Sequence, residues 1–217
     1  MEDTTLNTEF IKQGNIVEIR ELAQGIFKVT IETTDCNFKG PGQYAIVGVP
    51  DSNLERAYSV SEYDSRRFTI VIKNDNPCSE KISEMQIGDV LDVETGLGDG
   101  FDVDAIPNRA VLVADTSGIP QMLGLLRELL MQGKVCSLVL GYPSKSSIYM
   151  VDTFSTLCNN IEILTADGSN GRMGYAYDAV RNAEYVCAAG SVSMLEKLTG
   201  KAEAGQYNID GMNLIKW

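Results

Sequence analysis

Hydrophobic and polar positions follow two different patterns along this chain, and the change lies near residues 106–108. Before it, short segments rich in Val, Ile, Tyr, Phe and Thr are separated by turns that contain Gly, Pro, Asn or Asp, which is typical of β-strands. A short helix fits 79–86, where Ser79 would be the N-cap and Ile82 and Met85 would face inward. We expect an antiparallel Greek-key barrel with strands at 14–22, 26–33, 42–50, 56–63, 67–73 and 89–96.

After residue 108, continuous apolar runs alternate with segments of helical spacing. Because such alternation forms crossover units, we expect a parallel α/β sheet that binds ligands at the carboxyl ends of its strands. The residues from 205 onward are interpreted as a short tail. The fold class is therefore β + α/β, with a barrel domain at 1–104 and an α/β domain at 105–217. Strands are expected at 110–115, 135–143, 161–167 and 185–190, and helices at 119–133, 150–158, 174–183 and 191–200.

Composition and charge exclude several classes of protein. The 217 residues carry a net charge of −12, so nucleic acid would be repelled and no nucleic-acid partner is expected. No apolar run reaches the roughly 20 residues of a membrane span, and the polar start lacks the features of a signal peptide, so we expect a cytoplasmic protein without membrane contact. The chain has no histidine and five scattered cysteines, which argues against His-based catalysis, a disulfide framework and a His-ligated metal.

One short segment carries the first candidate chemistry, because Arg56, Ala57, Tyr58 and Ser59 follow one another on the fourth predicted strand. An arginine binds phosphate with paired donors, an aromatic ring stacks on a flat ring system, and a hydroxyl bonds a ring edge. On a strand, Arg56 and Tyr58 would point one way, and the backbone of Ala57 and Ser59 would stay close. The segment suits a flavin dinucleotide, and it also suits a strand with an exposed arginine and a half-buried tyrosine.

Three segments resemble one family. The stretch from Arg56 to Val103 contains the Arg-x-Tyr-Ser signature of the ferredoxin reductase superfamily. Within that superfamily, the electron-transfer subunit of dihydroorotate dehydrogenase is the family that two further segments resemble. These segments are "GLGDGFD" at 96–102 and "ADGSNGRMGYAYD" at 166–178. The resemblance runs from about residue 14 to about residue 198 and implies a flavin barrel followed by a nucleotide-binding domain.

The resemblance implies an FAD site on the barrel. Arg56 would pair with the pyrophosphate, Tyr58 would lie on the flavin or its ribityl side, and Ser59 would bond the ring edge. A Gly-Thr pair that holds phosphate in the family is Cys78-Ser79 here, so the hydroxyl is kept and the glycine is lost. The implied cofactor contacts are Arg56, Ala57, Tyr58, Ser59, Val71, Ile72, Lys73, Cys78 and Ser79.

The implied nicotinamide nucleotide site departs further from the family. The Gly-rich turn is "ADTSGIP" at 114–120, where Asp115 brings a carboxylate towards two phosphates; like charges about 4 Å apart cost roughly 1–4 kcal/mol. At the position of the family's reactive cysteine this chain has Ala189, and at the position of the family's proline it has Ser191. Cys187 is interpreted as a core residue. We therefore expect a degenerate NAD(P)H site. Its implied contacts are Thr116, Gly118, Asp167 and Gly190.

The family subunit also holds a [2Fe–2S] cluster with four closely spaced cysteines. No cysteine follows Cys187, so we expect no such cluster. The acidic residues Asp99, Asp102 and Asp104 are interpreted as a solvated loop, and no metal site is expected.

Two hypotheses follow. In the first, the chain is an FAD-binding oxidoreductase or electron-transfer subunit that passes electrons between flavin and a nicotinamide nucleotide or a partner protein, in a homo- or hetero-oligomer. In the second, it is a non-catalytic binding or regulatory module on a degenerate reductase fold. The motif at Arg56 to Ser59 favours the first, and the altered turn at Asp115 favours the second.

Overall fold

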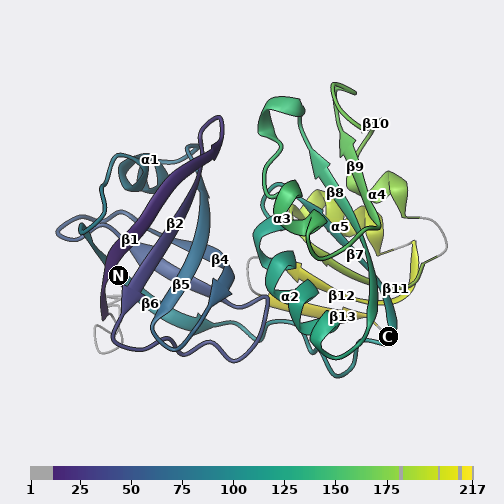
Figure 1. Cartoon of the computed structure of the whole chain (residues 1–217), viewed down its shortest axis with the longest axis horizontal. Coiled ribbons are helices and arrows are strands. Elements are labelled where there is room, and N and C mark those ends of the chain that lie inside the picture. The colour runs from purple at the N-terminus through teal and green to yellow at the C-terminus, as the bar shows by residue number, and fades with distance from the viewer. Residues whose placement is uncertain (1–11, 181–182, 200, 210–211, 217) are drawn as a thin grey trace, which may run out of the picture.

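The structure, a computed structural model, describes residues 12–180, 183–199, 201–209 and 212–216. Two parts lie side by side, a closed barrel and a seven-stranded sheet with helices on its faces (Figure 1). No helix within the described ranges is both long and apolar enough to cross a membrane.

The barrel is antiparallel, and its strand order β1-β2-β5-β4-β3-β6 is that of the predicted Greek key. Residues that alternate along the strands, such as Ile70 and Ile72, are fully buried and fill its interior. All six expected barrel strands are confirmed. They are β1 (Lys12–Ala23), β2 (Ile26–Thr33), β3 (Tyr44–Gly48), β4 (Glu55–Tyr63), β5 (Arg67–Lys73) and β6 (Val90–Leu97).

Helix α1 (Pro77–Ser83) follows β5 and begins earlier than predicted. Its N-cap is Asn76, whose side chain accepts a hydrogen bond from the Ser79 backbone N–H at 3.0 Å, so the prediction of Ser79 as the cap is wrong. The reason is local, because the fixed φ of a proline favours the first helical position directly after an Asn cap. Ile82, on the inner face of the helix, is fully buried, as predicted.

The second part is a sheet with the order β10-β9-β8-β7-β11-β12-β13. Its first six strands run parallel and β13 pairs antiparallel to β12. The predicted tail is therefore wrong, because the chain after residue 201 forms two further strands. The strands are β7 (Arg109–Asp115), β8 (Val135–Tyr142), β9 (Ile161–Thr165), β10 (Arg172–Met173), β11 (Ala183–Ala189), β12 (Ala202–Ile209) and β13 (Met212–Lys216).

Helices cover both faces of this sheet. Leu112 packs into a cluster with α2 and α3, and its neighbour Val113 packs into a separate cluster with α4 and α5. Continuous apolar strands are expected when both faces are buried in this way. The expected helices are confirmed, although α3 and α4 are much shorter than predicted. They are α2 (Ile119–Met131), α3 (Val151–Ser155), α4 (Ala176–Ala179) and α5 (Val192–Leu198), with a 3₁₀ turn η2 (Lys145–Ser147) after β8.

The two parts pack against each other through α2 and β4. The apolar cluster that contains Leu126 of α2 extends to Ile26 and Val71 of the barrel. At its edge, Arg127 forms an ion pair with Glu62 of β4. A shared apolar core fixes the relative position of the two parts, and with it the shape of the cavity between them.

Candidate functional site

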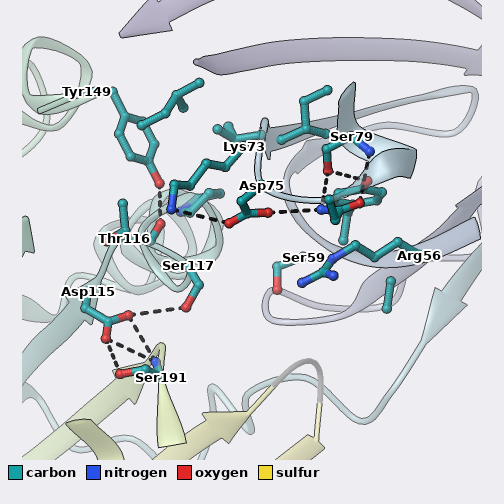
Figure 2. A pocket seen from close by; sticks show the side chains of 17 residues that line it. Arg56, Ser59, Lys73, Asp75, Ser79, Asp115, Thr116, Ser117, Tyr149 and Ser191 are labelled. Carbon is teal, nitrogen blue, oxygen red and sulfur yellow. Dashed lines mark hydrogen bonds and ion pairs between the residues drawn. The ribbon is translucent and has the colours of Figure 1, made fainter. Parts of the chain in front are cut away.

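A cavity of about 260 Å³ lies where the barrel faces the carboxyl ends of the parallel strands. Its barrel wall comes from β4, β5 and the start of α1, and its other wall comes from the turn between β7 and α2, together with Tyr149 and Ser191. Figure 2 shows Arg56 and Ser59 on one side of this cavity and Asp115, Ser117 and Ser191 on the other. A ligand bound here would contact both parts of the chain.

The structure brings most of the predicted cofactor contacts into this cavity. Cys78 is the exception, because it is only 4% exposed, lies in the barrel core and directs its thiol towards the Val47 carbonyl oxygen at 3.7 Å. The predicted contacts that line the cavity are Arg56, Ala57, Tyr58, Ser59, Val71, Ile72, Lys73 and Ser79.

A chain of polar side chains crosses the barrel wall of the cavity. The Lys73 ammonium lies 3.3 Å from the Asp75 carboxylate, and the Asn76 amide donates to Asp75 at 3.0 Å and to the Ser79 hydroxyl at 2.8 Å. Burial would raise the pKa of Asp75, but the hydrogen bond from Asn76 and the ion pair with Lys73 outweigh it and lower that pKa. The carboxylate therefore stays charged at neutral pH and holds Lys73.

Tyr58 joins this chain from the barrel interior. Its hydroxyl lies 2.8 Å from the Ser79 hydroxyl, and only 7% of the residue is exposed. Burial raises the pKa of Tyr58 well above its ordinary value, so the hydroxyl keeps its proton. Arg56, two residues earlier on β4, is exposed at the rim, and its guanidinium makes no ion pair or hydrogen bond within the described part of the chain.

On the sheet side, Asp115 does not point freely into the cavity. Its carboxylate accepts hydrogen bonds from the backbone N–H of Ser191 at 3.0 and 3.2 Å, from the Ser191 hydroxyl, and from the Ser117 hydroxyl at 3.3 Å. Of the predicted nicotinamide contacts, Thr116 lines the cavity and Gly190 lies against Asp115. Asp167 lies on an exposed turn and accepts hydrogen bonds from Ser169 instead.

Gly118 is required for the close approach of two elements. A Cβ atom on this residue would lie 1.9 Å from the carbonyl oxygen of Ala189, at the end of β11. Any side chain here would therefore push the start of α2 away from β11. The one glycine kept from the family's turn has a packing reason in this structure.

A second cavity of about 320 Å³ lies beside the first, between the ends of β7, β8 and β9 and the helices α4 and α5. Both cavities are lined by Asp115, Thr116 and Ser191. In its outer wall the rings of Tyr175 and Tyr177 stack with centroids 5.4 Å apart, and Lys197 lies over the Tyr177 ring at 4.5 Å. An aromatic wall with one ammonium suits a flat ring that carries negative charge.

Several lining residues were not predicted from the sequence, including Asp75, Asn76, Tyr149 and Lys197. Asn76 had a local signal, since an Asn directly before a proline at a strand end predicts a helix cap. Tyr149 had none. Its hydroxyl reaches the Thr116 carbonyl oxygen only because the loop after η2 folds back, held by the Tyr142 hydroxyl on the Tyr149 carbonyl oxygen at 2.7 Å.

Sequence comparison finds relatives over most of the chain, although no protein-family model matches it. The electron transfer subunit of dihydroorotate dehydrogenase B (NAD(+)) from Streptococcus thermophilus is 28% identical over 203 residues, which are 89% of this chain and 79% of that protein. The subunit of the same name from Bacillus caldolyticus is 30% identical over 169 residues, 73% of this chain and 65% of that protein.

Solved structures share the fold. A ferredoxin NADP⁺ reductase from Neisseria gonorrhoeae with bound FAD and NADP superposes with a TM-score of 0.75 at 15% identity, covering 88% of this chain and 89% of that one. An NADH-dependent reduced ferredoxin-NADP oxidoreductase gives a TM-score of 0.78 at 21% identity, covering 95% and 77%. The chain is thus similar in sequence to electron transfer subunits of dihydroorotate dehydrogenase B, and it shares the fold of the two reductase structures.

Proposed function

We propose that the chain binds FAD on its barrel and works as an electron-transfer protein. The observation that carries the proposal is the convergence of Arg56, Tyr58, Ser59 and Ser79 on one cavity that also faces the nucleotide-binding-like sheet. The names of the relatives support it, because they are electron transfer subunits. FAD, when bound, supplies one- and two-electron redox chemistry, and the protein supplies position and electrostatics.

The size of the cavity fits part of FAD. A volume of about 260 Å³ is slightly below the roughly 300–1,000 Å³ of common small-ligand pockets, so it holds a ring system and not a whole dinucleotide. The phosphates would then lie at the rim, where Arg56 presents an exposed guanidinium. Lys73 is less suited to this role, because Asp75 already pairs with it at 3.3 Å.

Hydroxyl groups would orient the ring. The Ser59 hydroxyl accepts a long hydrogen bond from the Gln121 amide at 3.4 Å, so its own proton is free to be donated to a ring atom. The Ser79 hydroxyl is held by Asn76 and Tyr58, each at 2.8 Å, and is fixed in direction. Apolar side chains of Ile26, Val71 and Ile72 line the same cavity and limit access of water.

We also infer a protein partner, because the relatives are named as subunits of a larger enzyme. The likeness does not assign dihydroorotate to this chain. The absence of a [2Fe–2S] cluster stays a prediction of the cysteine spacing. Within the described residues no group of three or more His, Cys, Asp or Glu side chains is placed to hold a metal ion.

The test is a fluorescence titration of apoprotein with FAD, for the wild type and two arginine variants. Arg56→Ala should weaken FAD binding by about 10- to 150-fold, which corresponds to a charged hydrogen bond of about 1.5–3 kcal/mol. Arg66→Ala is the matched control, because Arg66 is exposed beside Glu32, does not line the cavity and should leave the affinity unchanged. No binding by the wild type at high micromolar FAD would reject the proposal and favour the non-catalytic module.

A further inference from the structure

The sheet has a switch point between β7 and β11. From β7 the chain continues to β8 and β9 on one side, and later returns to β11 on the other side of β7. In open α/β sheets, ligands bind in the crevice at such a point, outside the carboxyl ends of the strands. Asp115 is the last residue of β7, and Ser191 follows directly after Gly190 at the end of β11. The two residues therefore lie at the mouth of this crevice.

The Asp115 carboxylate is held at the mouth of this crevice by several hydrogen bonds. Ser191 donates its backbone N–H and its hydroxyl to this carboxylate, and Ser117 donates from the other side at 3.3 Å. Gly190 has φ +146, and a Cβ atom on it would lie 2.1 Å from Asp115 Oδ1. The carboxylate thus rests directly on the Gly190 backbone, and the donors that hold it are neutral groups, so it keeps a net negative charge. We call this arrangement the Asp115–Ser191 latch.

The latch lies on the wall that the two cavities share, since Asp115, Thr116 and Ser191 line both. A nicotinamide dinucleotide that occupied both cavities would have to cross this wall. Its two phosphates would meet a fixed carboxylate. At separations near 4 Å, that repulsion weakens binding by about ten- to a thousandfold.

We propose that the Asp115–Ser191 latch is a specificity element that closes the flavin cavity to nicotinamide dinucleotides. The inference rests on the proposed function, because it assigns a selectivity to the same FAD site. It implies that the first cavity does not receive electrons directly from NADH or NADPH. Asp115 acts here by its charge and its position, and Ser191 acts by holding the carboxylate in place.

The experiment compares wild type, Asp115→Asn, Ser191→Ala and the control Asp99→Asn. Asp99 is exposed and lines neither cavity, so Asp99→Asn removes the same charge at a distance from the latch. Calorimetric titration with NAD⁺ measures binding without redox chemistry. Anaerobic mixing of FAD-loaded protein with NADH then follows loss of the flavin absorbance, since FAD, NADH and one proton from the buffer give FADH₂ and NAD⁺.

Asp115→Asn should bind NAD⁺ ten- to a thousandfold more tightly than the wild type, and its flavin should bleach at correspondingly lower NADH. Ser191→Ala keeps the charge of Asp115 and the hydrogen bonds from the backbone N–H of residue 191, so it should still exclude NAD⁺, and Asp99→Asn should match the wild type. Equal NAD⁺ affinity in wild type and Asp115→Asn, or rapid bleaching of the wild type, overturns the inference. Asp115→Ser is a second neutral variant in case the first does not fold. Failure to retain FAD counts against the proposed function alone, since the NAD⁺ titration still tests the latch.

Discussion

Replacing Asn76 with alanine is the sharpest test of the polar chain on the barrel wall. The Asn76 side chain caps α1 by accepting from the Ser79 N–H at 3.0 Å, and its amide donates to the Ser79 hydroxyl at 2.8 Å and to Asp75 at 3.0 Å. Loss of an N-cap costs about 1 kcal/mol, and loss of one buried hydrogen bond costs about 1 kcal/mol more. Asp75 is exposed, so water replaces the third bond. The free energy of unfolding should therefore fall by about 2 kcal/mol.

Urea denaturation of the apoprotein measures this change as a lower midpoint with an unchanged slope. Asn76→Asp keeps the capping acceptor but loses both donated bonds, so its loss should be intermediate. Asn74→Ala is the control, because Asn74 is exposed and its side chain donates to the Ser83 hydroxyl at 2.9 Å in an exposed hydrogen bond, while its backbone bond to Gly25 is kept; its change should stay within about 0.5 kcal/mol. If Asn76→Ala were as stable as Asn74→Ala, the Asn76 side chain would not organise this wall.

Three further predictions concern the core and the titrating groups. Phe154→Ala should lower the free energy of unfolding by about 3–5 kcal/mol in thermal or urea melts, because Phe154 is fully buried, whereas Val135→Ala at a 62% exposed site should change it little. Burial raises the pKa of Cys36 to about 11, so a thiol reagent should label it slowly at neutral pH and faster as the pH rises, and a pH-independent rate would contradict this. The pKa of Asp75 is lowered in the folded state, so its contribution to stability is present above the pKa of an unfolded Asp and is lost as the pH falls through the folded-state pKa; acid titration of Asp75→Asn should lack this component.

The order of the barrel and the α/β part was predictable from sequence, and so were most residues on the barrel side of the cavity, because both depend on local patterns. Strand alternation and turn residues located β1 to β6, and the motif from Arg56 to Ser59 located one wall of the cavity. The antiparallel pairing of β12 and β13 also has a local signal in the sequence, because the Asp-Gly pair between them favours tight hairpin turns. The domain boundary at 104/105 stays a prediction, since an apolar cluster with Ile26, Val71 and Leu126 extends across both parts.

The role of Asp115 was not available from sequence. A carboxylate in a turn predicts repulsion of phosphates, but its partner Ser191 is 76 residues away and meets it only because β7 and β11 are neighbours in the sheet. In the same way, Cys78 and Ser79 are adjacent in sequence, but one lies in the barrel core and the other lines the cavity, because a helix turns successive side chains in different directions. Residue types and local spacing thus determined the fold class, most of the elements and one half of the site. Long-range packing decided which polar groups are already satisfied within the chain and which are left to bind a ligand.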